Sequence, residues 1–243
     1  MESSWNGFLC ERFEFEGRDA IIVFPKVKSA VREWALKTEY WNAFPDIEIK
    51  LLERGFHLAF VKNKTRFATK EDCDIKARFV KYISEKYTLS NKCVPIGMSC
   101  GGAHAVNFAG LYPELIQCMY IDAPFLNFCS YPGKIGNAEC ERVWQNEFVK
   151  AYTGIERYML LNSDIHPICK ADILIKNKIP VVLVYGTEDN TVIYEENGKL
   201  LEMAYDGTGL MTLIKVGCRG HHPHGKIGDN TEVVNAICNL CDM

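Results

Sequence analysis

The chain alternates short, continuously apolar runs with longer segments in which apolar residues recur at helical spacing. A short apolar run is typical of a strand that is buried on both faces of a sheet. Such runs lie at residues 20–24, 57–61, 93–96, 119–122, 179–185 and 213–216. Residues 13–16 alternate between apolar and charged side chains, which predicts a half-exposed strand, and residues 17–19 are typical of a turn.

Between these runs, the spacing of apolar residues predicts helices. The clearest is residues 71–87, where one apolar stripe is formed by Ile75, Phe79, Ile83 and Tyr87. Further helices are predicted at residues 46–54, 102–111 and 231–240. Strands that alternate with helices predict an α/β fold, in which helices cover both faces of a mostly parallel central sheet.

One interval between predicted strands is too long for a simple crossover. Residues 124–178 include a helical pattern, with a spacing of four between Cys140, Trp144, Phe148 and Tyr152. We expect this insertion to form a small helical lid over the carboxyl edge of the sheet, where open α/β sheets bind ligands. No repeat or low-complexity linker interrupts the sequence, so we expect residues 1–243 to form a single domain.

Composition and charge narrow the functional classes. The 243 residues are 48% hydrophobic and 24% charged, with a formal net charge of -3, as in a soluble globular protein. This charge argues against a nucleic-acid-binding protein, and no apolar run has the length of a membrane span. The N-terminal residues lack a secretory signal, and the eleven cysteines are typical of reduced, buried side chains. We therefore expect a cytoplasmic protein.

The segment Gly97-Met98-Ser99-Cys100-Gly101 stands between a predicted strand and a predicted helix. It matches Gly-x-Ser-x-Gly, a sharp strand-to-helix turn that exposes a nucleophilic serine. Small neighbours let the backbone fold tightly, and the first N–H groups of the following helix can stabilise a developing negative charge. Ser99 is therefore the predicted nucleophile, and the backbone N–H of Cys100 is a predicted oxyanion donor.

A serine at such a turn needs a basic histidine and a carboxylate that orients it, and the chain order is serine, acid, histidine. Asp189 lies in the turn after the predicted strand 179–185 and is the favoured acid. Glu188 and Asp206 are alternatives, and Asp122 stands at a strand end where it could be an alternative acid or simply a turn residue.

The loop after the last predicted strand carries the candidate bases His221, His222 and His224. We favour His221, because it follows Gly220 in a loop that must approach the serine closely. His222 is the alternative base, and Pro223 separates His224 from the other two. The extra histidines could instead bond within the loop or line the pocket.

A competing interpretation is a zinc site. The three histidines could combine with Cys238 and Cys241, whose Cys-x-x-Cys spacing is typical of metal ligands. Such a site would leave the Gly-x-Ser-x-Gly turn unexplained, and this pair of cysteines lies on a predicted helix that needs an apolar face. We therefore expect neither a metal nor another cofactor.

The segments GMSCGG, YGTEDNTV and GHHPHG together resemble the α/β-hydrolase superfamily. Within it, the chain is similar to small serine esterases related to acyl-sugar esterases and prolyl-oligopeptidase-like hydrolases, over roughly residues 13–241. The resemblance implies a serine hydrolase that forms an acyl-enzyme and cleaves a small-molecule ester, with short acyl groups on a sugar as expected substrates. The alternatives are a peptidase of the prolyl-oligopeptidase-like type and a catalytically silent ligand-binding protein of this fold.

In such hydrolases the second oxyanion donor follows the first central strand. The matching loop is residues 24–28, so we expect the backbone N–H of Lys26 or Val27 to be that donor. The aromatic residues that follow are candidates for the walls of a substrate pocket, namely Trp34, Tyr40 and Trp41.

Overall fold

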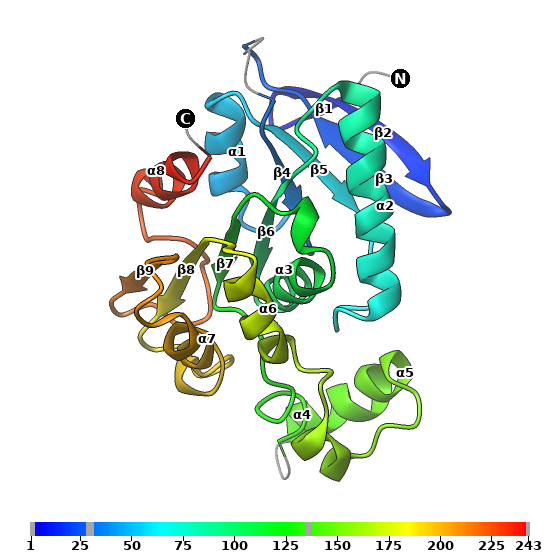
Figure 1. The fold of residues 1–243 in the computed structure, drawn as a ribbon, viewed down its shortest axis with the longest axis vertical. Coiled ribbons are helices and arrows are strands. Elements are labelled where there is room, and N and C mark those ends of the chain that lie inside the picture. Colours follow the sequence, from blue (N-terminus) through cyan, green and yellow to red (C-terminus); the bar gives the residue numbers. More distant parts are fainter. Residues whose placement is uncertain (1–2, 28–31, 135–137, 242–243) are drawn as a thin grey trace.

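The computed structural model describes residues 3–27, 32–134 and 138–241, and its centre is a twisted sheet (Figure 1). In the described residues this sheet has nine strands in the order β1-β2-β3-β5-β4-β6-β7-β8-β9. The strands from β5 to β9 in this order are parallel, whereas β1, β2 and β3 pair antiparallel. The predicted α/β architecture is therefore confirmed, with an antiparallel edge.

The bounds of the strands place most of the predicted apolar runs in the sheet. The strands are β1 (Ser3–Trp5), β2 (Phe8–Phe15), β3 (Arg18–Val23), β4 (Trp34–Lys37), β5 (His57–Val61), β6 (Val94–Met98), β7 (Met119–Asp122), β8 (Val181–Gly186) and β9 (Met211–Val216). The turn expected at residues 17–19 is shorter than predicted, because Arg18 and Asp19 already pair with β2.

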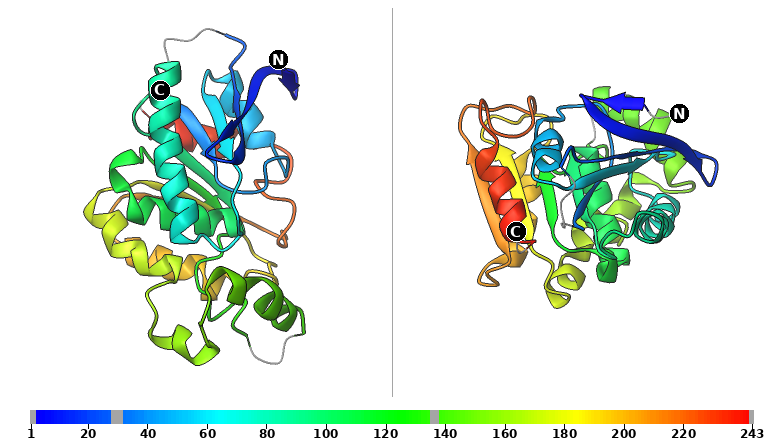
Figure 2. Two further views of the ribbon diagram at one scale, coloured as in Figure 1. Left: turned by 90° about the vertical axis from the view of Figure 1, so that its right-hand side faces the viewer. Right: turned by 90° about the horizontal axis from the view of Figure 1, so that it is seen from above.

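Helices cover both faces of the sheet, as the two views of Figure 2 show. One apolar core lies under α2 (Lys70–Tyr87), α3 (Cys100–Leu111), α6 (Ala171–Lys176) and α7 (Gly198–Tyr205). A second core lies on the other face, under α1 (Asp46–Glu53) and α8 (Thr231–Asn239). Short 3-10 helices occur at Pro113–Leu115, Arg157–Asn162, Pro167–Lys170 and Tyr194–Glu196.

The long insertion between β7 and β8 is helical where its sequence predicts a helix. Continuous helical backbone runs through α4 (Ala138–Val143), a π-helical turn (Trp144–Phe148) and α5 (Val149–Ala151). In Figure 1 these helices lie at the lower end of the molecule, away from α1 and α8. Trp144 and Phe148 form a separate aromatic core with Phe67 and Phe128, which attaches the insertion to the rest of the chain.

Trp34 is a core residue and not the pocket wall that its aromatic character predicts. It begins β4, a strand that apolar periodicity did not reveal because it is short and ends with Lys37. Its side chain is fully buried, and its indole N–H donates to the carbonyl of Ser90 at 2.9 Å. Trp41 likewise packs in the second core, against Trp5 and Phe60.

The placement of Trp34 generates a test of stability. Trp34→Phe should lower the free energy of unfolding by about 1–3 kcal/mol, because it loses buried volume and the bond to Ser90. Urea denaturation measures this loss, with Tyr158→Phe as the control because Tyr158 is 68% exposed. Unchanged stability in Trp34→Phe would contradict the core assignment.

Candidate active site

Ser99 stands at a strained turn between β6 and α3. Its backbone has a φ of 53° and a ψ of -120°, a conformation that is rare outside glycine. The turn closes so tightly that a Cβ at Gly97 would lie 2.2 Å from the carbonyl oxygen of Gly101. A Cβ at Gly102 would lie 2.5 Å from the Pro124 side chain. Glycines at these positions are therefore a steric requirement of the turn.

A chain of hydrogen bonds joins Ser99 to a histidine and a carboxylate. His221 Nε2 lies 3.0 Å from Ser99 Oγ, and His221 Nδ1 lies 2.7 Å from Asp189 Oδ2. The other oxygen of Asp189 accepts backbone N–H groups of Thr191 and Val192, both at 2.9 Å. Because an ionised carboxylate accepts only, Nδ1 carries the proton and Nε2 is free to accept the serine hydroxyl.

The surroundings of Asp189 keep its carboxyl group ionised. Burial opposes ionisation, but the hydrogen bond from His221 and the two backbone donors outweigh it, so the pKa lies below its ordinary value. The side chains of Asp189 and His221 are 2% and 8% exposed. Few water molecules can therefore compete for their hydrogen bond.

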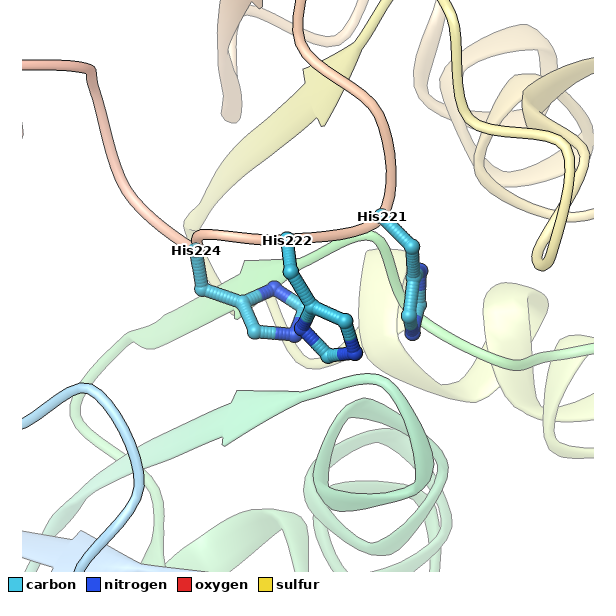
Figure 3. Close-up of side chains that lie close together, drawn as sticks. All are labelled: His221, His222 and His224. Carbon is cyan, nitrogen blue, oxygen red and sulfur yellow. The ribbon is translucent and has the colours of Figure 1, made fainter.

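The structure brings together Ser99, Asp189 and His221, the favoured nucleophile, acid and base. The alternative residues do not take their places. Glu188 and Asp206 are exposed, and no described hydrogen bond joins either of them to a histidine. Figure 3 shows the rings of His221, His222 and His224 on the same side of one loop. Of these three rings, His221 has the nitrogen within hydrogen-bond distance of Ser99 Oγ.

Asp122 has a structural role, a point that the sequence alone did not decide. It ends β7, is fully buried, and accepts two N–H groups of Arg219 at 2.9 and 2.6 Å. The Tyr120 hydroxyl and the backbone N–H of Gly225 donate to the same carboxylate. Burial raises its pKa, yet the bonds to His224 and Arg219 bring the pKa below its usual range.

Arg219 therefore ties the histidine loop to the centre of the sheet. The loop also packs against the acid turn, because Gly186 allows the Arg219 carbonyl oxygen within 2.2 Å of where a Cβ would stand. That carbonyl accepts the backbone N–H of Glu188 at 2.9 Å. Sequence reasoning missed Arg219, since an arginine beside glycine in a loop is typical of an exposed residue.

A pocket of about 320 Å³ opens beside Ser99. Its walls come from the loops after β4, β7 and β8, and include the apolar or aromatic side chains of Tyr40, Phe44, Met98, Phe125, Tyr131 and Val192. Arg66 and Glu139 add charged groups, and the three histidines form another side. Tyr40 is thus at the pocket as predicted, whereas Trp34 is not among the residues around it.

Lys26 lies at the wrong end of the sheet to donate to an oxyanion at Ser99. Its loop follows β3, which runs antiparallel to β5 and ends where Val23 pairs with Leu58 near the start of β5. Ser99 follows the carboxyl end of β6, the opposite edge. The Lys26 ammonium lies 4.8 Å from the ring centre of Phe8 instead. This prediction is wrong, and Lys28 of the same loop lies outside the described residues.

The strand next to β6 whose carboxyl end faces Ser99 is β4, so the loop at residues 38–40 takes the expected place. The Thr38 Oγ1 lies 2.9 and 2.7 Å from the carbonyl oxygens of Ile96 and Gly101, which share its single hydroxyl proton and fix this loop to the serine turn. Burial raises the pKa of the Tyr40 hydroxyl, which stays protonated. Burial also raises the pKa of the Cys100 thiol, so this sulfur is not a thiolate competitor of Ser99.

The structure does not place Cys238 and Cys241 beside the three histidines, as the zinc interpretation requires. Among the described residues, the three histidines form a group whose possible ligand atoms lie within 4.8 Å of one another, and this group contains no cysteine. Cys238 and Cys241 belong to the second core, where Cys241 Sγ lies 3.8 Å from Cys118 Sγ. The histidine and cysteine clusters are therefore separate features.

No family model matches the sequence, and no curated protein matches it either. Solved structures do match its fold. Est1E from Butyrivibrio proteoclasticus is 15% identical with a TM-score of 0.66, and the match covers 96% of this chain and 99% of that one. A truncated carbohydrate esterase from gut microbiota is 17% identical with a TM-score of 0.66, over 93% and 91% of the two chains.

Peptidases match with similar geometry over a smaller share of their length. A puromycin-hydrolyzing peptidase of Mycobacterium tuberculosis is 12% identical with a TM-score of 0.73, over 96% of this chain and 38% of that one. The chain spans 35% of a dipeptidyl aminopeptidase IV-like structure from Bacteroides ovatus. Together these matches define the class of fold: the chain has the α/β-hydrolase fold.

No helix in the described ranges has the length and apolar character needed to cross a membrane.

The Asp122–Arg219 pair generates a pH-dependent prediction. Asp122→Asn leaves Arg219 buried without its charge partner and should cost about 3–5 kcal/mol of unfolding free energy at pH 7. Because the folded pKa of Asp122 is lowered, its contribution is complete above about pH 5 and declines as the pH falls through the unfolded value of about 3.9. Urea denaturation at several pH values should show the gap between wild type and variant closing below pH 4. Asp19→Asn, at an exposed carboxylate, is the control, and an equal gap at all pH values would contradict the assignment.

Proposed function

We propose that this protein is a serine hydrolase that cleaves small carboxylic esters through an acyl-enzyme. The observation that carries the proposal is the unbroken hydrogen-bond chain from Ser99 through His221 to Asp189, placed at a strained turn beside an open pocket. A structural serine needs neither the strain nor an oriented imidazole at its hydroxyl.

In the proposed reaction His221 Nε2 accepts the hydroxyl proton as Ser99 Oγ attacks the ester carbonyl carbon. Asp189 stabilises the imidazolium that forms. The imidazolium then gives its proton to the leaving alcohol, and the acyl group stays on Ser99. Water, deprotonated by the same imidazole, attacks the acyl-enzyme and releases the acid. No step in this sequence needs a cofactor.

The oxyanion would form at the start of α3. The backbone N–H of Cys100 is among the first in that helix, which have no partner within it, and it is our first donor. Tyr40 replaces Lys26 as the candidate for the second donor, because it follows β4 and lines the pocket with a neutral hydroxyl. Each such donor is commonly worth about 3 kcal/mol of transition-state stabilisation.

The shape and polarity of the pocket favour a short acyl group on a polar alcohol. A volume of about 320 Å³ is at the small end of ligand sites. Apolar walls suit the acyl group, while Arg66 and Glu139 can face hydroxyl groups of a sugar. The match in fold to a carbohydrate esterase supports this choice.

The insertion between β7 and β8 supplies Tyr131 and Glu139 to the pocket, which supports its proposed role as a lid. Eight of the eleven cysteines are buried, as is typical of reduced cysteines that act as small apolar side chains, which supports a reducing compartment such as the cytoplasm.

Hydrolysis of chromogenic esters tests the proposed reaction. Wild type should hydrolyse p-nitrophenyl acetate, and Ser99→Ala should reduce kcat to the background rate. Asp189→Asn should lower kcat by about 10⁴-fold, because the imidazole loses its oriented tautomer. Asp206→Asn, at an exposed carboxylate that does not touch the triad, serves as the matched control. Equal kcat in Ser99→Ala and wild type would exclude the mechanism.

A panel of substrates distinguishes an esterase from the two alternatives, a peptidase and a catalytically silent ligand-binding protein. We expect kcat/KM to fall from acetyl to octanoyl esters, since the pocket is small, and acetylated sugars to be cleaved. Faster cleavage of aminoacyl anilides than of any ester would favour the peptidase. Folded protein that cleaves nothing in the panel would favour the silent ligand-binding protein.

A further inference from the structure

The histidine loop concentrates three imidazoles at the mouth of the pocket, more than the proposed reaction uses. The ring centres of His221, His222 and His224 are 4.7 to 5.1 Å apart, and one ring nitrogen of each lies within 4.8 Å of the others. Figure 3 shows all three rings on one side of the loop. The triad accounts for one of these rings.

The arrangement behind two of the rings is that of metal-binding histidines. A histidine that binds a metal usually presents its other ring nitrogen to a carboxylate, which fixes the ring and its tautomer. His221 Nδ1 has Asp189 at 2.7 Å, and His224 Nδ1 has Asp122 Oδ1 at 3.4 Å. The hydrogen bond to Asp189 leaves Nε2 of His221 as the donor of a lone pair, whereas the His224 ring lies near Asp122 without a hydrogen bond to it.

The third ring can adjust to a ligand. His222 is exposed and stacks on Phe44, with ring centres 5.4 Å apart and an angle of 17° between the rings. The main chain on either side is held by Arg219 and Gly225 on Asp122.

We propose that His221, His222 and His224 bind a divalent transition-metal ion such as Zn²⁺, and that the bound ion blocks Ser99. Nitrogen ligands at about 2.0–2.1 Å in tetrahedral geometry lie about 3.3 Å apart, so the ring nitrogens must close by about 1–1.5 Å. On binding, the hydrated ion loses water, and the Nε2 lone pair of His221 forms a coordinate bond. The hydrogen bond from Ser99 Oγ to Nε2 breaks, and the serine proton stays on its oxygen.

The metal site stands on the histidine geometry alone, whereas the inhibition rests on the proposed function. A filled site would make the hydrolase inactive until a chelator removes the ion. This behaviour is opposite to that of a metal-dependent enzyme, which a chelator inactivates. Imidazole nitrogens suit Zn²⁺, Cu²⁺ and Ni²⁺, whereas Mg²⁺ and Ca²⁺ prefer oxygen, so these last two ions should have no effect.

The first test measures binding without reference to activity. Untagged protein carrying Cys218→Ser, which removes an exposed thiol near the loop, is titrated with Zn²⁺ by calorimetry and with Co²⁺ by visible absorption. We expect one site, with Kd raised at least tenfold in His222→Ala and in His224→Ala. Ser99→Ala and His57→Ala, whose histidine lies on β5, should bind as wild type does. A Kd that neither loop variant changes, or thiolate bands in the Co²⁺ spectrum, would overturn the site.

The second test measures ester hydrolysis with and without Zn²⁺. Zn²⁺ should inhibit the wild type at the concentrations that fill the site, a chelator should restore the rate, and His222→Ala should need at least tenfold more Zn²⁺. Full activity at saturating Zn²⁺ would overturn the inhibition. Protein that binds Zn²⁺ at the histidines but hydrolyses no ester when metal-free would refute the proposed function and leave the metal site standing.

Discussion

A buried ion pair at the end of a central strand is the constraint on which the candidate site depends. Asp122 and Arg219 are both fully enclosed, and together they join β7 to the loop that carries the histidines. Removing either partner of such a pair leaves the other charge buried and uncompensated, so both residues are needed to keep this geometry. His221 stands two residues beyond Arg219, and its reach to Ser99 follows from that anchor. The same anchor gathers the other two imidazoles.

The turn that carries Ser99 is the second rigid part of the candidate site. Glycines at 97 and 102 let the backbone fold so closely that other side chains would collide, and Thr38 bonds the neighbouring loop to the same turn. Asp189 is held from both sides, by backbone N–H groups on one oxygen and by His221 on the other. The strained serine and the oriented base are thus held by different elements that share Asp122: its carbonyl accepts the Ser99 backbone N–H at 2.9 Å, and its carboxylate holds Arg219.

The features that could be predicted are those that depend on residues close together in the sequence. Buried strands are apolar and the serine turn is rich in glycine, so the α/β fold, Ser99, Asp189 and His221 could be placed from sequence. Strand order is a long-range property, and because β4 was not recognised, the oxyanion loop was expected after the antiparallel strand β3, at Lys26, and not at residues 38–40 after β4. Trp34 was misassigned and Arg219 was not singled out for the same reason: their partners, Ser90 and Asp122, are distant in the chain.

The most direct test of the activated serine is the intact mass after incubation with a fluorophosphonate, which reacts with a serine only where a neighbouring base activates it. Wild type and Ser163→Ala should each gain one adduct, and Ser99→Ala should gain none while its circular dichroism and thermal midpoint match those of wild type. An unmodified, folded wild type would contradict the account, as would an adduct that persists in Ser99→Ala.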